Sequence, residues 1–115
     1  MVSALIRLPI PTLLAAATIA TITVADDVFA KPASCFTTDD GHYDCDFQSL
    51  DRDGSFSISA PGYPTYSLWI DSPGFAAGFV ELGGRNVSLP GLYERQDDDA
   101  ACWGNPETDT RLCAW

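Results

Sequence analysis

Turn-forming residues interrupt this chain at short intervals from position 53 onward, and they limit what it can fold into. The interruptions are Asp53-Gly54, Pro61-Gly62, Pro73-Gly74, Gly83-Gly84 and Pro90-Gly91. Proline fixes φ and glycine accepts a positive φ, so Pro-Gly suits the two central positions of a type II turn. No segment between these turns sustains a helical period, so short strands are expected.

Apolar residues alternate with polar ones in most of the segments between the turns. In SFSIS, Phe56 and Ile58 fall on one face of an extended strand, as do Tyr66, Leu68 and Ile70 in TYSLWID. FAAGFVEL carries apolar side chains on both faces, and RNVSLP and LYER are two further short segments. This spacing predicts an all-β fold, an antiparallel sandwich or small barrel of about seven or eight short strands.

The four cysteines allow three disulfide pairings, and the turns between them favour two local bridges. Asp39-Asp40-Gly41 suits a three-residue hairpin loop, which would set Cys35 opposite Cys45. Pro106 suits the second position of a type I turn, which would set Cys102 opposite Cys113. Each closed loop would contribute roughly 2.5–3 kcal/mol in the chain-entropy model.

Metal and redox chemistry fit the cysteines less well than disulfides do. The chain has no C-x-x-C, and His42 is its only histidine, so no zinc site and no cofactor are expected. With the cysteines in bridges and no serine on a strained elbow near His42, no nucleophile is set up for catalysis. A β domain of this size is also expected to offer little concave volume for a substrate. A protein without enzymatic activity is therefore predicted.

The first thirty residues have the layout of a signal peptide. Met1 and Arg7 give a positive start, and residues 13–25 form a run of apolar residues and threonines that is shorter than a membrane span. Cleavage is expected after Ala30, with Ala25 as a second site, and an uncleaved anchor is the alternative. The domain proper then covers residues 31–115, and a secreted or periplasmic location without a stable membrane span follows.

Acidic residues outnumber basic ones, 16 to 6, for a formal net charge of −10. Removing residues 1–30 takes away only Arg7, Asp26 and Asp27, so the domain stays strongly acidic. Nucleic acid and anionic membranes would be repelled. A basic protein partner or a cation would be attracted, although such a charge also serves solubility alone. The oligomeric state is left open.

Four residues are candidates for binding a partner: Trp69, Tyr93, Arg95 and Trp103. Trp69 points away from the apolar face of its segment, and exposed aromatic residues beside arginine are typical of protein interfaces. A second packed face of a sandwich would explain the same residues.

The C-terminal segment raises a separate question, because a tryptophan lies near each of its cysteines. Alternation places Trp103 and Trp115 on opposite faces of the last hairpin. We expect Trp115 to pack on the disulfide and Trp103, opposite Leu112, to contact a partner.

The segments YDCDF, DGSFSIS and LPGLYERQDDDAACWGNPETDTRLCAW together resemble a family of small secreted bacterial proteins. This likeness runs over most of the domain, but it implies no activity. A secreted, non-catalytic domain that binds a protein or envelope component is the function that the residues and this resemblance favour.

A second likeness concerns the layout of Tyr43-Asp44-Cys45, Gly91, Tyr93 and Trp103-Gly104. This layout is similar to that of periplasmic inhibitors of animal-type lysozyme. The resemblance implies a small acidic β-barrel whose Ser-Gly-x-x-Tyr and Trp-x-Lys-Gly segments carry the inhibitory loops. Here Pro90 stands in place of that serine, and no lysine follows Trp103. Inhibition of a basic lysozyme-type hydrolase is therefore the alternative function.

Overall fold

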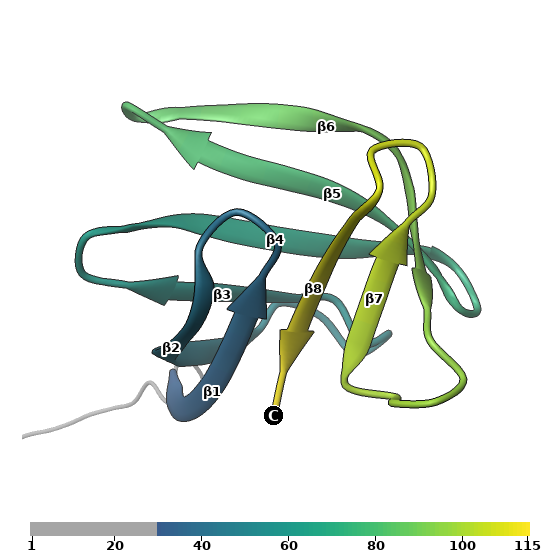
Figure 1. Ribbon diagram of the computed structural model, residues 1–115, viewed down its shortest axis with the longest axis horizontal. Helices are drawn as coiled ribbons and strands as arrows, with labels where there is room; N and C mark the ends of the chain where they lie inside the picture. The colour runs from purple at the N-terminus through teal and green to yellow at the C-terminus, as the bar shows by residue number, and fades with distance from the viewer. Residues whose placement is uncertain (1–29) are drawn as a thin grey trace, which may run out of the picture.

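The computed structural model describes residues 30–115, whose eight strands form one antiparallel sheet that closes into a barrel (Figure 1). The strands are β1 (Lys31–Thr37), β2 (Gly41–Ser49), β3 (Phe56–Ala60), β4 (Tyr63–Ser72), β5 (Phe75–Leu82), β6 (Arg85–Arg95), β7 (Cys102–Asn105) and β8 (Thr110–Ala114). The all-β prediction is confirmed, and of its two alternatives the barrel is formed. The predicted signal segment lies outside the described residues apart from Ala30, and none of the described residues form a helix with the length and hydropathy of a membrane span.

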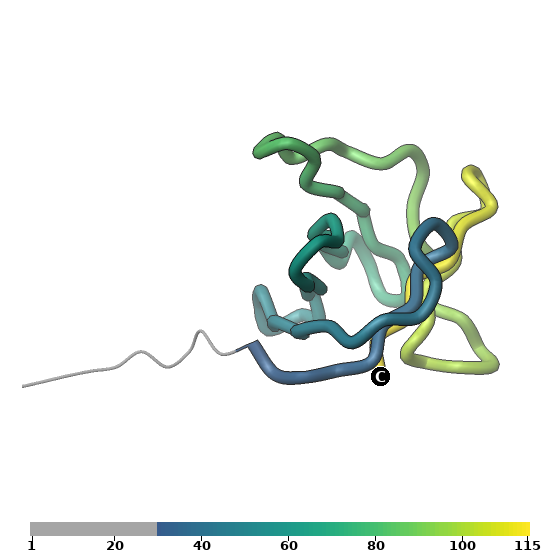
Figure 2. The backbone as a smooth tube through the Cα atoms, turned by 60° about the vertical axis from the view of Figure 1, so that its left-hand side comes forward, coloured from purple at the N-terminus to yellow at the C-terminus, as the bar shows by residue number. Residues whose placement is uncertain are grey.

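Each strand pairs with the next one in the chain, and β1 pairs with β8 to close the barrel. The closing register sets Thr37 opposite Leu112 and Cys35 opposite Ala114. Ser34 and Trp115 extend it, because each backbone amide donates to the other residue's carbonyl, at 3.1 and 2.8 Å. Figure 2 shows the C-terminal end of the chain beside the first strand.

The barrel interior is filled by the residues that alternate inward along the strands. Phe56, Ile58, Tyr66 and Leu68 are buried in one cluster, as the alternation in β3 and β4 predicts. Trp69, between two inward positions of β4, is 41% exposed on the outer face, which also agrees with the pattern.

The segments RNVSLP and LYER are not two strands, because β6 runs through both of them. Ala77 pairs with Leu92 and Phe79 with Ser88, so residues 89–91 of β6 lie opposite Gly78 alone. Gly91 has a φ of +71°, which glycine adopts without strain. Pro90-Gly91 therefore forms a bulge that bends the strand, not a turn that ends it.

Both predicted disulfides are present, Cys35–Cys45 and Cys102–Cys113. Cys102 lies directly opposite Cys113, as predicted. The prediction that Cys35 lies opposite Cys45 is wrong, because Cys35 is opposite Tyr43 and the bridge joins diagonal positions, with a Cα–Cα distance of 5.9 Å.

The β1–β2 turn accounts for this difference in register. Thr37 pairs with Gly41, so the turn residues are 38–40 and not 39–41. The Thr37 hydroxyl donates to Asp40 Oδ2 at 2.9 Å and accepts from the Asp40 amide at 3.0 Å. These two hydrogen bonds hold the turn at residues 38–40. The neighbouring strands are close enough for a disulfide between diagonal positions.

Of the expectations for the two C-terminal tryptophans, the one that Trp103 contacts a partner is wrong. Trp103 is 2% exposed and packs in the core with Leu112, whereas Trp115 is 49% exposed. The two residues do project from opposite faces of the β7–β8 hairpin, but Trp103 takes the inner face. Trp115 lies outside, where its ring stacks on His42 with centroids 5.9 Å apart and its indole N–H donates to Asp99 Oδ2 at 3.0 Å.

Candidate functional site

The four predicted binding residues do not form one site. Trp69 lies on the outer face of β4, and Trp103 is in the core. The Arg95 guanidinium lies 4.7 Å from the centroid of the Trp103 ring, a cation–π contact that shields one tryptophan face from solvent. Tyr93 is buried and lines a cavity.

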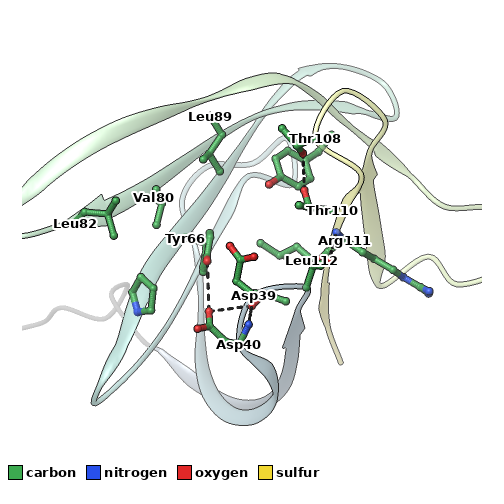
Figure 3. A pocket seen from close by; sticks show the side chains of 14 residues that line it. Asp39, Asp40, Tyr66, Val80, Leu82, Leu89, Thr108, Thr110, Arg111 and Leu112 are labelled. Carbon is green, nitrogen blue, oxygen red and sulfur yellow. Dashed lines mark hydrogen bonds between the residues drawn. The ribbon is translucent and has the colours of Figure 1, made fainter.

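That cavity has a volume of about 460 Å³ and lies at one end of the barrel (Figure 3). Alternate turns of an up-and-down barrel meet at the same end. The cavity lining accordingly includes the β1–β2 turn and residues at the β3–β4, β5–β6 and β7–β8 turns. We call it the mouth cavity. It contradicts the expectation that this small domain would offer little concave volume.

The wall of the mouth cavity is mostly apolar. Its apolar side chains come from β4, β5, β6 and β8, and they are Pro64, Tyr66, Val80, Leu82, Leu89, Tyr93 and Leu112. Leu82 is 51% exposed at the last position of β5, on a hairpin that reaches well beyond the β7–β8 turn (Figure 1). An apolar hollow of this size, open to solvent, is the usual setting of a ligand site.

Two carboxylates from the β1–β2 turn face this wall. Asp39 is exposed and Asp40 half-buried, and Figure 3 shows both beside Tyr66 and Leu112. Arg111 also belongs to the lining, but its side chain extends away from the other residues. The cavity therefore combines an apolar wall with negative charge at its entrance.

Asp40 is tied to two hydroxyl groups of the cavity. Thr37 donates to Asp40 Oδ2 at 2.9 Å, and the Tyr66 hydroxyl donates to the same oxygen at 3.4 Å. Desolvation by burial, followed by the charges of Asp40 and Asp39, raises the pKa of Tyr66 to about 12. Tyr66 is therefore a neutral donor at neutral pH, and it orients one oxygen of Asp40 while leaving the other without a partner among the described residues.

A second tyrosine beneath this end of the barrel is also kept neutral. Tyr43 is buried, its ring stacks on Tyr63 with centroids 4.1 Å apart, and its hydroxyl has no hydrogen-bond partner within residues 30–115. Desolvation by burial, followed by the charge of Asp40, raises the pKa of Tyr43.

No protein-family model, curated protein or solved structure matches the chain. The function is therefore inferred from the mouth cavity and its charges. Among residues 30–115 no cluster of three or more histidine, cysteine or acidic side chains is arranged to hold a metal ion.

The residues that build the mouth cavity were not among the predicted site residues, apart from Tyr93. The sequence pattern predicts only a turn for Asp39 and Asp40, and for Tyr66 only a place on the apolar face of its strand. A signal was present, since alternate turns of a barrel meet at one end and would bring residues 38–40 near residues 106–109. This signal can be used only when the sheet is known to close into a barrel, and the sequence pattern is also compatible with a sandwich.

The outer surface carries a second exposed apolar feature. Trp69, Ala77 and Leu92 are paired across β4, β5 and β6, and the side chains of Trp69 and Leu92 are exposed. Phe75 is also exposed, on the same face of β5 as Ala77. Trp69, one of the predicted contact residues, therefore lies in this outer stripe.

Proposed function

We propose that this protein is a secreted or periplasmic, non-catalytic binding domain that recognises a basic protein through its mouth cavity. The observation that carries the proposal is the position of Asp39 and Asp40 beside an apolar cavity of about 460 Å³. Two disulfides and the lack of a membrane-spanning helix among the described residues are compatible with an extracellular or periplasmic location.

A lysine or arginine side chain has the chemistry that such a cavity accepts. Its aliphatic stem can pack against Leu82 and Leu89 while its charged end reaches the carboxylates. A hydrogen bond between ionised partners is stronger than a neutral one, so the free oxygen of Asp40 is a favourable acceptor. An anionic ligand would meet the same carboxylates and would be repelled.

The charge of the whole chain acts in the same direction as the cavity. A net charge of −10 attracts a basic partner and accelerates its association at low ionic strength. The complex should therefore weaken as salt is added, because screening shortens the range of these interactions to about 10 Å at 0.1 M.

The test is capture of a basic protein from periplasmic extract and host fluid on the immobilised domain, followed by titration of the captured protein. The Asp39→Asn, Asp40→Asn double variant should bind at least about tenfold more weakly. The matched control is Asp97→Asn, Asp98→Asn, which removes the same charge from an exposed connection that does not line the cavity. The control should bind like the wild type apart from a small change in salt dependence.

Two results would overturn the proposal. One is that the wild-type domain captures no basic protein. The other is that both double variants lose affinity equally, because binding would then depend on net charge and not on the cavity. Thermal unfolding of each variant shows whether the fold has been preserved.

The alternative function is inhibition of a basic lysozyme-type hydrolase. It is favoured by the acidic eight-stranded barrel, which agrees with the architecture that the resemblance implies. Trp103 is buried in the core, however, and Tyr93 is reached only through the mouth cavity that it lines, so inhibition by this chain would have to use that cavity. Unchanged cell-wall lysis by a basic lysozyme, at a large molar excess of the domain and low salt, would dismiss this alternative.

A further inference from the structure

The first half of β6 has a free backbone edge beside the mouth cavity. β6 pairs with β5 from Arg85 to Ser88, but it pairs with β7 only at Glu94 and Arg95. Within the described chain, the start of β6 therefore has a strand neighbour on one side only. A strand edge with unpaired amide and carbonyl groups is a template for another extended chain.

The register identifies the groups on that edge. Leu82 and Arg85 flank a two-residue turn, so they form a hydrogen-bonded pair. Hydrogen-bonded and non-hydrogen-bonded pairs alternate along the ladder, so Val87 also bonds to β5. Asn86 and Ser88 consequently turn their N–H and C=O groups away from β5, toward the free side.

The free edge is short because its far end is already occupied. The Asn105 side-chain amide donates to the Pro90 carbonyl at 2.7 Å, and Pro90 has no amide hydrogen to offer. An added strand can therefore extend along residues 85–89 and no further, since the β7–β8 hairpin meets β6 at that point.

An extended chain on this edge would place a side chain over the cavity. Val87 and Leu89 belong to the inner face of β6, where Val87 packs against the core and Leu89 lines the mouth cavity. Neighbouring strands of a sheet keep their side chains in register, so a residue of the added strand beside Val87 would also point inward. Asp39 and Asp40 line the same cavity.

We propose that an extended segment of the basic partner adds as a strand to residues 85–89 of β6 and inserts a lysine or arginine into the mouth cavity. Main-chain pairing would supply affinity, and the cavity would select the basic side chain, as in other cases of strand addition. The inference rests on the proposed function. A second copy of this chain is a poorer occupant, because it would bring two net charges of −10 together.

The test uses a short synthetic peptide with a central lysine between β-branched residues, together with three matched peptides. One has glutamate in place of lysine, one is methylated on alternate backbone nitrogens, and one has both changes. Amide hydrogen exchange of the whole domain, measured by NMR, should show slower exchange at Asn86 and Ser88 when the lysine peptide is added. The methylated peptides should give no such protection.

Two variants of the protein test the same main-chain hydrogen bond by changing residue 88 of β6 instead of the peptide. Ser88→Pro removes the free amide hydrogen without touching the β5 ladder, and proline is tolerated on edge strands. Ser88→Pro should weaken binding of the lysine peptide about tenfold. Ser88→Ala, which keeps the amide hydrogen, should bind the peptide like the wild type.

The outcomes separate the two proposals. If the lysine peptide perturbs Asp39, Asp40 and Tyr66 without protecting Asn86 and Ser88, strand addition is wrong and the cavity proposal stands. If the peptide perturbs none of these residues, both proposals fail. Protection of Asn86 and Ser88 that rises with protein concentration in the absence of peptide would make a second copy the occupant and would also overturn the inference.

Discussion

Asn105 joins β7 to the bulge of β6, because its side-chain amide donates to the Pro90 carbonyl at 2.7 Å. Its carbonyl oxygen accepts from the Glu107 amide at 3.0 Å, so the same side chain also holds the β7–β8 turn. Asn105 is 2% exposed. This one buried side chain therefore determines where the free edge of β6 ends and where the β7–β8 turn lies at the mouth of the barrel.

Replacing Asn105 by alanine should destabilise the domain by about 1–3 kcal/mol, because the Pro90 carbonyl and the Glu107 amide would both lose their partner. Urea unfolding followed by circular dichroism measures this change. Asn86→Ala, at an exposed position of β6, should change stability by no more than about 0.5 kcal/mol. Equal effects of the two substitutions would show that the Asn105 bonds contribute nothing.

Gly78 provides the space for the Tyr93 ring. A Cβ atom added at Gly78 would lie 2.5 Å from Tyr93 Cε1 and 3.3 Å from Leu68 Cδ2. Both neighbours are buried, so Gly78→Ala should cost about 1–3 kcal/mol of stability through overpacking. When Gly78→Ala is combined with Tyr93→Leu, the total loss of stability should be smaller than the sum of the losses in the two single variants. Additive losses would contradict this contact.

The titration of Tyr66 should report its contact with Asp40. The pKa of about 12 for Tyr66 arises first from desolvation and then from Asp40, so Asp40→Asn should lower it only part of the way toward 10. Ultraviolet absorbance of tyrosinate, compared with that of Tyr66→Phe, isolates this residue. An unchanged titration in Asp40→Asn would remove Asp40 as a cause.

The same pKa shift has a consequence for stability at high pH. The folded chain holds the Tyr66 proton more tightly than the unfolded chain does. The stabilising contribution of Tyr66 to the fold is therefore complete below pH 10 and is lost as the pH rises toward about 12. Tyr43 acts in the same direction, since its pKa is also raised. Tyr66→Phe should therefore show a shallower loss of stability in this range when urea unfolding is repeated at several pH values.

The contact between Asp99 and Trp115 should respond to acid. The hydrogen bond from the Trp115 indole, followed by one from the Ala101 amide, holds the pKa of Asp99 below its ordinary value of 3.8. The stabilising contribution is therefore present above pH 3.8 and is lost as the pH falls through the lower folded pKa. Tryptophan fluorescence should change in that acidic range for the wild type, and the change should be reduced in both Asp99→Asn and Trp115→Phe. A fluorescence profile that is the same in all three proteins would contradict this account.

Much of the fold could be predicted from short stretches of the chain. Phe56 and Ile58 share one face because side chains of an extended strand alternate, and this holds whatever lies on either side. Cys102 and Cys113 face each other because a four-residue turn with Pro106 sets the register of its own two strands. Each of these features depends on residues within one hairpin.

The candidate site could not be predicted in the same way. Asp40 and Leu112 line one cavity only because β1 pairs with β8, which sets Thr37 opposite Leu112. Nothing in the local pattern of either strand specifies that pairing. The one-residue shift of the β1–β2 turn does not follow from Asp39-Asp40-Gly41 alone, because the Thr37 hydroxyl bonds to both the side chain and the amide of Asp40 in the observed turn.

The sequence by itself determined most of the strands, most of their turns and both disulfides, because alternation and turn conformation act over a few neighbouring residues. Only the tertiary structure decided that Trp103 is buried and Trp115 exposed, and that Pro90-Gly91 bends a strand instead of ending it. A hairpin with apolar residues on both faces does not specify which face is covered. That choice depends on what packs against each face, and here closure of the barrel put Trp103 inside.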